Sequence, residues 1–346
     1  MSPTLVAMTP LEALDRVIHC LDRSFDIGDK GFKARAFVRA REVVRNTPPE
    51  EIAQRAARKT LTDLDGIGAA TARLITEVLA DGESAYLAKI ESETQLTLTA
   101  EAQEYRDALR GDCHLHSTWS DGGATIEAMA AAAIALGHEY IVLTDHSARL
   151  TVAHGLDRDR LLQQLAIIEA LNEQLAPFRI LTGMEVDINE DGSLDLDDDL
   201  LARLDVVVAS VHSKLRMAAP EMTLRMVRAV VSPHVDILGH CTGRLREKRP
   251  PSVFDAKVVF DACAEFGTAV EINSRPERLD PPFELLERAV AAGCWFSIDS
   301  DAHSTGQLEW QPHGCERAAR CAVPLDKVIN TLGADDLLSA IGSALS

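Results

Sequence analysis

Histidine and carboxylate residues recur in this sequence at spacings that suit metal binding. His114 and His116 are two residues apart, and Asp301 and His303 repeat that spacing near the C-terminus. Residues two apart on an extended segment point to the same face. Five further candidates stand singly between the two pairs: Asp121, His146, Glu185, His212 and His240. Imidazole combined with carboxylate is the ligand mixture of zinc, manganese and iron sites, so we expect these residues to bind metal.

The number of candidate ligands favours several ions over one. Nine side chains exceed the coordination of one tetrahedral ion, but they suit two or three ions that share a bridging carboxylate. Ions about 3.5–4 Å apart activate water and clamp a phosphoryl group during in-line displacement. The chemistry that these residues predict is therefore the hydrolysis of a phosphate ester.

Short apolar segments alternate with amphipathic helical stretches from residue 111 onward. The predicted strands are 112–116, 140–145, 179–187, 205–212, 235–241, 268–273 and 295–299. This alternation predicts a parallel sheet covered by helices, and seven units in a row favour a barrel over a doubly wound open sheet. The carboxyl ends of the strands form one face of a barrel. Because the candidate ligands end or follow predicted strands, we expect them to converge on that face. The alternative is that each histidine has a separate structural role, but this would not explain why all of them fall at the ends of strands.

The motifs around these residues resemble the PHP (polymerase and histidinol phosphatase) family. They are HLHSTWSDGG, LTDH, GMEVDI, VASVH, DILGH, EIN and SDAH. The stretches GSLDL, LDVVVASVHSK, HVDILGHCTGRL and EINSRPERLD resemble more closely the C-terminal PHP domain of bacterial family X DNA polymerases. The resemblance covers about residues 111–340 and implies a distorted (β/α)7 barrel, similar to a TIM barrel, with three metal positions.

The resemblance also assigns ligands to three divalent ions (zinc, manganese or iron). The first ion would bind His114, His116, Glu185 and Asp301. The second would bind Glu185, His212 and His240, and the third Asp121, His146 and His303. Every ligand position of the family is filled, which argues against an inactive copy. One departure is Cys241, which follows His240 where the subgroup usually has proline.

Arginine and asparagine residues near the predicted mouth are candidates for contact with the substrate. Arg244, Arg275 and Arg278 follow the fifth and sixth predicted strands, where guanidinium groups can hold phosphate oxygens. Salt bridges within the loops are the alternative. Asn273 ends the sixth strand and can hydrogen-bond substrate or water. The candidate catalytic residues are His114, His116, Glu185, Asp301, Arg244 and Asn273.

Residues 1–90 are predicted to form a separate helical domain, which a linker helix (91–110) joins to the PHP domain (111–346). FDIGDKGFKARAFVRA and LDGIGAATARLI resemble the small domain that opens family X DNA polymerases. The second segment resembles a helix-hairpin-helix, whose backbone N–H groups meet a DNA phosphate. This resemblance implies contact with DNA ends or gaps through Lys30, Lys33, Arg35, Arg39, Gly66, Gly68 and Arg73. A solvated helix face and an ordinary glycine turn are the alternatives.

Two departures from the polymerases limit the predicted activity. Only about 20 residues separate the two domains, which leaves no room for a polymerase palm and fingers, so we exclude DNA synthesis. The lysine that forms a Schiff base in the lyase members corresponds to Leu74, beside Arg73. Arginine stays protonated and cannot replace that amine, so we expect no such lyase activity.

The net charge of −19 lies outside the N-terminal domain. Residues 1–90 contain 13 Lys+Arg and 13 Asp+Glu, which leaves 22 and 41 for the rest of the chain. An acidic barrel repels a polyanion unless metal ions dominate its site, so the N-terminal domain is the expected DNA contact. Seven dispersed cysteines predict reduced thiols in the cytoplasm, and no apolar run approaches a membrane span. The sequence contains no GxGxxG motif, so we expect no nucleotide cofactor.

These features predict a metal-dependent phosphoesterase that hydrolyses phosphodiester bonds of DNA, as a 3′–5′ exonuclease or end-processing enzyme in repair. The alternative is a phosphomonoesterase acting on small molecules, like the histidinol phosphatases of the family, because the same metals serve both reactions. A non-catalytic DNA-binding protein with structural metals is a third hypothesis. Structural zinc sites are usually closed by four ligands, which disfavours it.

Overall fold

The computed structural model describes residues 8–22 and 27–342. The chain divides into two compact units, and the boundary between them in the sequence falls between Thr97 and Leu98. Each unit has its own core of buried apolar side chains. Among the described residues, none of the helices combines the length and apolar character that crossing a membrane requires.

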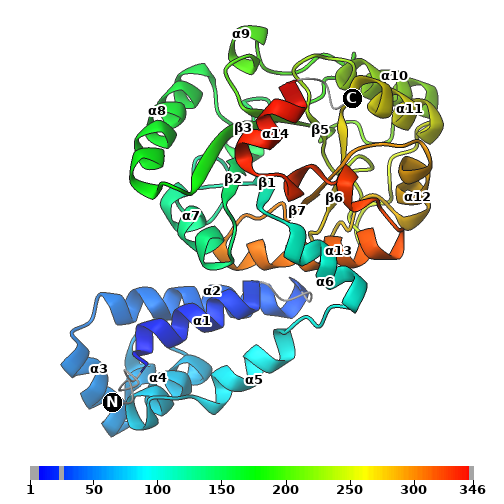
Figure 1. The fold of residues 1–346 in the computed structure, drawn as a ribbon. Coiled ribbons are helices and arrows are strands. Elements are labelled where there is room, and N and C mark those ends of the chain that lie inside the picture. Colours follow the sequence, from blue (N-terminus) through cyan, green and yellow to red (C-terminus); the bar gives the residue numbers. More distant parts are fainter. Residues whose placement is uncertain (1–7, 23–26, 343–346) are drawn as a thin grey trace. The chain divides into compact units, whose positions relative to one another are not determined.

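The N-terminal unit is built from helices only, as its sequence predicts. Its helices are α1 (Pro10–Asp22), α2 (Ile27–Arg45), α3 (Pro49–Arg58), the short 3-10 helix Leu61–Asp63, α4 (Ala69–Asp81) and α5 (Ala85–Thr94) (Figure 1). Apolar residues at helical spacing, such as Leu14 and Val17 in α1, are fully buried between them. The ring of Phe37 in α2 stacks on Tyr86 in α5 with centroids 5.8 Å apart.

A glycine turn leads into α4. Gly66 has a φ of +100°, and a Cβ there would lie 3.0 Å from side-chain atoms of Arg39 and Val43 in α2. Both conditions favour glycine at this position. Gly68 precedes α4, and its N–H donates to the hydroxyl of Thr71 at 3.0 Å.

The interval 91–110 differs from the single linker helix expected from the sequence. It contains the end of α5, an extended stretch and helix α6 (Ala100–Ala108), which belongs to the second unit. The break falls in Leu-Thr-Leu-Thr (96–99), where β-branched threonines favour extended backbone. Thr99 then begins α6 by accepting a hydrogen bond from the N–H of Ala102.

The second unit is a barrel of seven parallel strands in sequential order. They are β1 (Gly111–Leu115), β2 (Tyr140–Leu143), β3 (Arg179–Asp187), β4 (Val206–Ser210), β5 (Ile237–Leu238), β6 (Ala269–Asn273) and β7 (Phe296–Asp299). The ends of β1 and β7 also meet, since the N–H of Asp301 donates to the carbonyl of His114 at 2.9 Å. The predicted barrel is confirmed, and sequential strand order excludes the doubly wound sheet.

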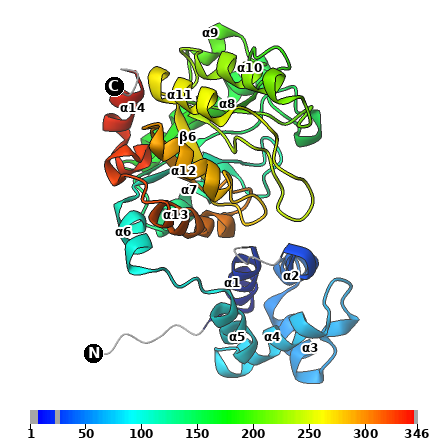
Figure 2. The ribbon, with the colours of Figure 1, turned by 90° about the vertical axis from the view of Figure 1, so that its right-hand side faces the viewer.

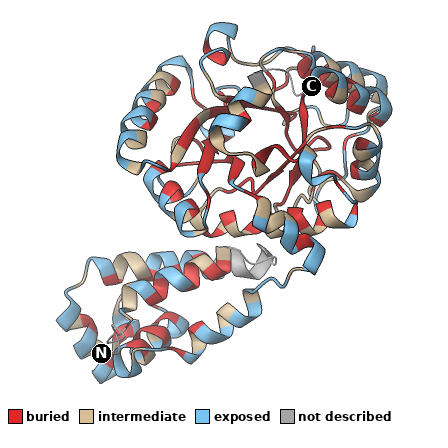
Figure 3. Ribbon diagram, viewed as in Figure 1, coloured by how far each residue is buried: buried red, intermediate tan, exposed pale blue. Residues whose placement is uncertain are grey.

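Helices surround the barrel (Figure 2). They are α7 (Ile126–Ala135), α8 (Arg158–Leu175), α9 (Asp198–Leu201), α10 (Ala219–Val230), α11 (Ala256–Phe266), α12 (Phe283–Ala291), α13 (Gln311–Arg320) and α14 (Ala334–Gly342). Short 3-10 helices lie at Thr151–Ala153, Thr305–Trp310, Leu325–Lys327 and Ile329–Thr331. Figure 3 shows buried strands inside and exposed outer helix faces, as expected for strands covered by helices.

Strand β5 is much shorter than the predicted segment 235–241. Only Ile237 and Leu238 pair with the neighbouring strands. Gly239 follows, and its backbone lies so close to the Ser210 side chain that a Cβ there would be 2.3 Å from the hydroxyl oxygen. The early end of β5 releases His240 and the following residues into a loop at the mouth of the barrel.

Candidate metal centre

All nine predicted ligands lie at the carboxyl ends of the barrel strands. His114 and Glu185 are on β1 and β3, and the other seven follow β1, β2, β4, β5 and β7. They form four overlapping groups whose ligand atoms are within 4.8 Å of one another: His114/Glu185/His240, His114/His116/Asp301, His146/Glu185/His212 and His116/Asp121/His146/His303. Side chains from six strands and their loops thus meet at one mouth.

Glu185 is the centre of the inner part of this cluster. It is 1% exposed, and its Oε2 lies 3.2 Å from Nε2 of His114 and 3.0 Å from Nδ1 of His146. Its Oε1 lies 2.8 Å from Nε2 of His240 and 3.2 Å from Nε2 of His212. One carboxylate therefore faces imidazoles on both of its oxygens, as a bridging ligand must.

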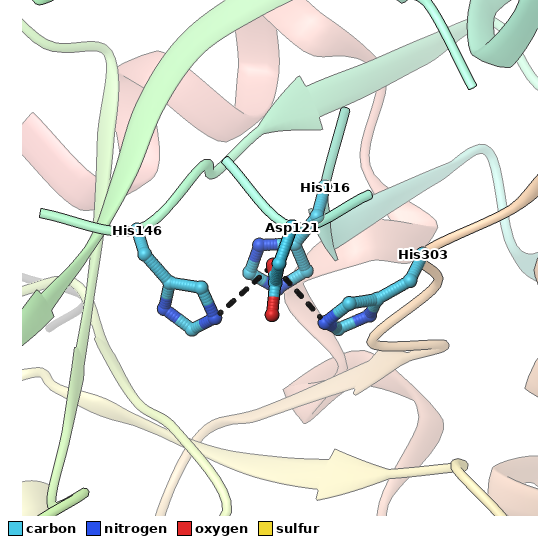
Figure 4. Close-up of side chains that lie close together, drawn as sticks. All are labelled: His116, Asp121, His146 and His303. Carbon is cyan, nitrogen blue, oxygen red and sulfur yellow. Dashed lines mark ion pairs between the residues drawn. The ribbon is translucent and has the colours of Figure 1, made fainter. Parts of the chain in front are cut away.

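The outer group surrounds Asp121 (Figure 4). Its Oδ1 lies 3.6 Å from Nε2 of His146 and 3.5 Å from Nε2 of His303. The ring of His116 lies against both, with centroids 4.4 Å from His146 and 4.2 Å from His303. The Asp121 side chain is 35% exposed, whereas the inner ligands are buried, so the cluster is open to solvent on this side.

Unpartnered ring nitrogens indicate that the cluster fits cations. Six buried ring nitrogens of the cluster accept or donate no hydrogen bond among the described residues: Nε2 of His114, both nitrogens of His116, Nδ1 of His146, Nε2 of His212 and Nδ1 of His240. A buried polar atom without a partner is costly. Four of the six belong to rings whose nitrogens approach Glu185 within 3.2 Å, and a metal ion among them would supply the missing partner.

The electrostatics of the cluster keep its carboxylates ionised. Burial alone would raise the pKa of Glu185, but His114, His212 and the neighbouring imidazoles hold that pKa well below its usual range. The pKa of Asp301 is lowered in the same way, against burial, by Arg275 and His116. Burial and the adjacent His303 and His146 lower the pKa of His116. Ionised carboxylates beside a neutral imidazole are the protonation states that cations require.

Comparison with known proteins identifies the family. The PHP domain matches residues 112–275. A probable phosphatase of Thermoanaerobacter sp. (strain X514) is 30% identical over 232 residues, which are 64% of this chain and 89% of the relative. The chain belongs to the PHP family. This finding confirms the resemblance of the sequence motifs, and with the metal-ligand clusters it makes the chain a PHP phosphoesterase, a hydrolase of phosphoric esters.

A longer relative aligns with part of its length. The DNA polymerase/3′-5′ exonuclease PolX of Bacillus subtilis (strain 168) is 40% identical over 229 residues, which are 66% of this chain but 40% of PolX. The chain thus spans less than half of that relative. Among solved structures, a histidinol phosphate phosphatase of Lactococcus lactis in complex with zinc, L-histidinol and phosphate aligns with 61% of this chain and 93% of its own, at 18% identity and a TM-score of 0.44.

Two further carboxylates, which were not among the residues predicted from the sequence, orient histidines of the PHP site. Oε1 of Glu271 lies 2.6 Å from Nδ1 of His114, and Oδ1 of Asp187 lies 2.6 Å from Nδ1 of His212. An ionised carboxylate only accepts, so Nδ1 carries the proton and Nε2 keeps its lone pair for a metal. Their spacing in the sequence could have identified them, because residues two apart on a strand point to the same face. Asp187 stands two residues after Glu185, and Glu271 stands two residues before Asn273.

We expect Glu271→Gln to raise the Mn²⁺ concentration that gives the half-maximal rate about 10–100-fold, because loss of an orienting carboxylate weakens its ligand by that factor. Glutamine keeps the shape but removes the charge beside His114. Saturating Mn²⁺ should restore most of the rate. The measurement is a Mn²⁺ titration of phosphoesterase activity. Glu139→Gln, at an exposed ion pair with Arg110, is the matched control. An unchanged titration in the Glu271 variant would exclude the orienting role.

The predicted catalytic residues Arg244 and Asn273 contact protein groups in the PHP barrel. Nε of Arg244 donates to the carbonyl of Arg278 at 2.8 Å, and Nη2 donates to the carbonyl of Leu279. Arg244 thus supports the loop after β6, and its contact with phosphate stays a prediction. Nδ2 of Asn273 lies 3.2 Å from Oδ2 of Asp301, so this amide holds a predicted ligand. The expectation that it faces substrate has no support in these contacts.

Arg275 and Arg278 are the arginines that reach the cluster. Nε of Arg278 donates to Oδ2 of Asp301 at 3.0 Å, and Nη1 of Arg275 lies 3.2 Å from Nδ1 of His303. Nη1 of Arg278 is buried and has no hydrogen-bond partner among the described residues. Its N–H groups remain available for an anion at the mouth.

The predicted DNA contacts of the N-terminal unit lie partly in ion pairs. Arg39 pairs with Asp65 at 2.6 Å, and Arg73 with Glu77 at 2.6 Å. Lys33, Arg35 and Arg39 are exposed along α2. Gly66 and Gly68 form the turn before α4 described above, and the Lys30 side chain lies outside the described residues. The first ion pair reduces the positive charge that α2 presents to a polyanion, and the second does the same on α4.

Proposed function

We propose that this PHP barrel hydrolyses phosphodiester bonds at the 3′ end of DNA, as an exonuclease or end-processing enzyme in repair. The observation that carries the chemistry is the gathering of nine ligand side chains, Glu185 among them, at one mouth of the barrel, which suits several neighbouring cations. The choice of DNA is supported by the 40% identity to PolX, against 30% to the probable phosphatase of Thermoanaerobacter.

The proposed cofactors are three divalent ions, zinc, manganese or iron. Their ligands would be His114, His116, Glu185 and Asp301 for the first ion, Glu185, His212 and His240 for the second, and Asp121, His146 and His303 for the third. Bound cations of this kind activate water and neutralise charge on phosphoryl oxygens. The overlapping groups at the barrel mouth support the first and third sets. The second set is supported by Oε1 of Glu185, which faces Nε2 of both His212 and His240.

The residues of the chain would position the phosphoryl group in this site. Glu271 and Asp187 fix the rings of His114 and His212, so those ligands are oriented before substrate arrives. The Arg278 guanidinium, with Nη1 unpartnered, would hold a non-bridging oxygen. Asn273 keeps the Asp301 carboxylate in place. The N-terminal domain would bring DNA ends or gaps to the barrel through the exposed cations of α2 and the turn at Gly66.

A small-molecule phosphomonoesterase is the second candidate. The specific observation in its favour is that the chain covers 89% of a relative named as a probable phosphatase, but 40% of PolX. The metal ligands serve both reactions equally. The two hypotheses differ in salt dependence, because contacts with several phosphates release counterions and make DNA binding fall with salt.

The decisive assay compares DNA with simple phosphate monoesters. We expect the purified chain with Mn²⁺ to shorten a 5′-labelled oligonucleotide from its 3′ end faster than it hydrolyses p-nitrophenyl phosphate or histidinol phosphate. Asp301→Asn and His116→Ala should lower either rate by roughly 10²–10³-fold, because each removes a predicted ligand. Circular dichroism should show both variants folded. Rates equal to the unchanged protein in both variants would assign the hydrolysis to another source.

A further inference from the structure

Charge is divided unevenly around the mouth of the barrel. The loops after β4, β5 and β6 (211–218, 239–255 and 274–282) contain eight Lys and Arg against four Asp and Glu. The loops after β1, β2 and β3 (116–125, 144–157 and 188–197) contain one Arg against seven Asp and Glu. We call the first three loops the basic rim. It stands out because the chain beyond residue 90 carries the whole net charge of −19.

Contacts between the three loops make the basic rim one connected surface. The Ser252 hydroxyl donates to the carbonyl of Leu215 at 2.9 Å, which joins the loops after β4 and β5. The N–H of Arg246 donates to the carbonyl of Glu277 at 2.7 Å, and this joins the loops after β5 and β6. Arg244 adds its contacts to the carbonyls of Arg278 and Leu279.

The basic rim also adjoins the metal-ligand cluster. His212 and His240 open its first two loops, and Arg278 of the third loop bonds Asp301. Lys214 and Arg216 are exposed two and four residues after His212. Among the described residues, no carboxylate lies within ion-pair distance of either. Lys248 is 69% exposed and has one contact at 3.3 Å, with Glu277. Positive charge therefore begins at the predicted ligands and extends outward over one half of the mouth.

We propose that the basic rim binds the phosphates of the DNA strand next to the hydrolysed end, so that the strand leaves the site over the loops after β4, β5 and β6. The inference rests on the proposed action on DNA and adds a second polyanion contact within the barrel. A single phosphate monoester reaches only the metal-ligand cluster and its arginines. A strand places further phosphates over Lys214, Arg216 and Lys248, where cations attract them. The acidic loops after β1, β2 and β3 repel the same strand.

The test reverses charge at two rim positions in the full chain. Lys214→Glu combined with Arg216→Glu should lower kcat/KM on a 20-nucleotide single strand at least about ten-fold and flatten its dependence on salt. Each lost phosphate contact on a single strand removes about 0.7 from the slope of log kcat/KM against log salt. The rate on thymidine 5′-p-nitrophenyl phosphate, which has no neighbouring phosphates, should change less than two-fold.

A matched variant separates the surface from net charge. Lys257→Glu combined with Arg288→Glu makes the same charge change on the exposed sides of α11 and α12. We expect it to keep the single-strand rate and salt slope of the unchanged protein. Equal loss in both double variants, or an unchanged slope in the rim variant, would overturn the inference. Equal loss on the small ester would do so too. If the unchanged protein leaves DNA intact at every salt concentration, the proposed action on DNA is wrong, and the inference that rests on it is wrong as well.

Discussion

Replacing Glu185 with glutamine should lower the hydrolytic rate by about 10³-fold or more, the largest effect expected of any single substitution in this chain. Glu185 presents both oxygens to surrounding imidazoles, at 2.8–3.2 Å from His114, His146, His212 and His240. Glutamine has similar volume but only one acceptor oxygen and no charge. Cations that share this carboxylate would lose a common ligand. They would also repel one another more strongly, because the neutral amide no longer offsets their charge. We therefore expect the variant to retain less metal than the unchanged protein.

Two measurements on the same preparation test this expectation. Initial rates on phosphate esters give the loss of activity, and elemental analysis after desalting gives the metal content. Asp236→Asn is the matched control, since it makes the same carboxyl-to-amide change at the amino end of β5. Burial raises the pKa of Asp236 to about 7, so its carboxyl is already partly neutral. A Glu185 variant that keeps the rate and the metal content of this control would contradict the central role of Glu185.

The ligand residues were predictable because two local rules coincide at them. Period-two alternation places residues on one side of a strand, and the end of an apolar run marks the mouth of a barrel. Glu185 satisfies both rules near the end of β3, and Asp301 stands two residues after the end of β7. Barrel closure then brings together positions that are 116 residues apart, as seen in the sequence numbers of Glu185 and Asp301. The same rules extend to Asp187 and Glu271, whose orienting role could have been inferred from spacing.

Contacts that depend on loop paths were not predictable. Arg244 follows β5 as expected, but its guanidinium turns to the carbonyls of Arg278 and Leu279. No periodicity describes the loop 239–255, and its course depends on Gly239, Gly243 and contacts with two other loops. Nonlocal contacts therefore decide the course of this loop. The predicted linker helix was wrong for a local reason, because the threonines of Leu-Thr-Leu-Thr (96–99) favour extended backbone and interrupt the helix.

Removal of divalent cations should abolish hydrolysis and lower the melting temperature, and Mn²⁺ should restore both. Without cations, several buried ring nitrogens of the imidazoles around Glu185 have no hydrogen-bond partner among the described residues. A cation present at about 100 times its dissociation constant stabilises the folded chain by about 2.7 kcal/mol. For a domain of this size that corresponds to a rise of about 5–10 °C. Thermal unfolding after EDTA treatment and desalting, with and without added Mn²⁺, measures the change.

The rise in melting temperature that Mn²⁺ causes should be larger at pH 8.5 than at pH 6.5. Burial alone would lower the pKa of His212, but Glu185 and Asp187 raise it to about 9 in the metal-free protein. Because this pKa exceeds that of an unfolded histidine, about 6.5, the ion pairs of protonated His212 stabilise the metal-free fold fully below about pH 6.5 and are lost as pH rises through about 9. Cations must displace the same proton, so their affinity increases over that range. A Mn²⁺-induced rise that is equal or greater at pH 6.5 would show that protons on this cluster do not compete with metal.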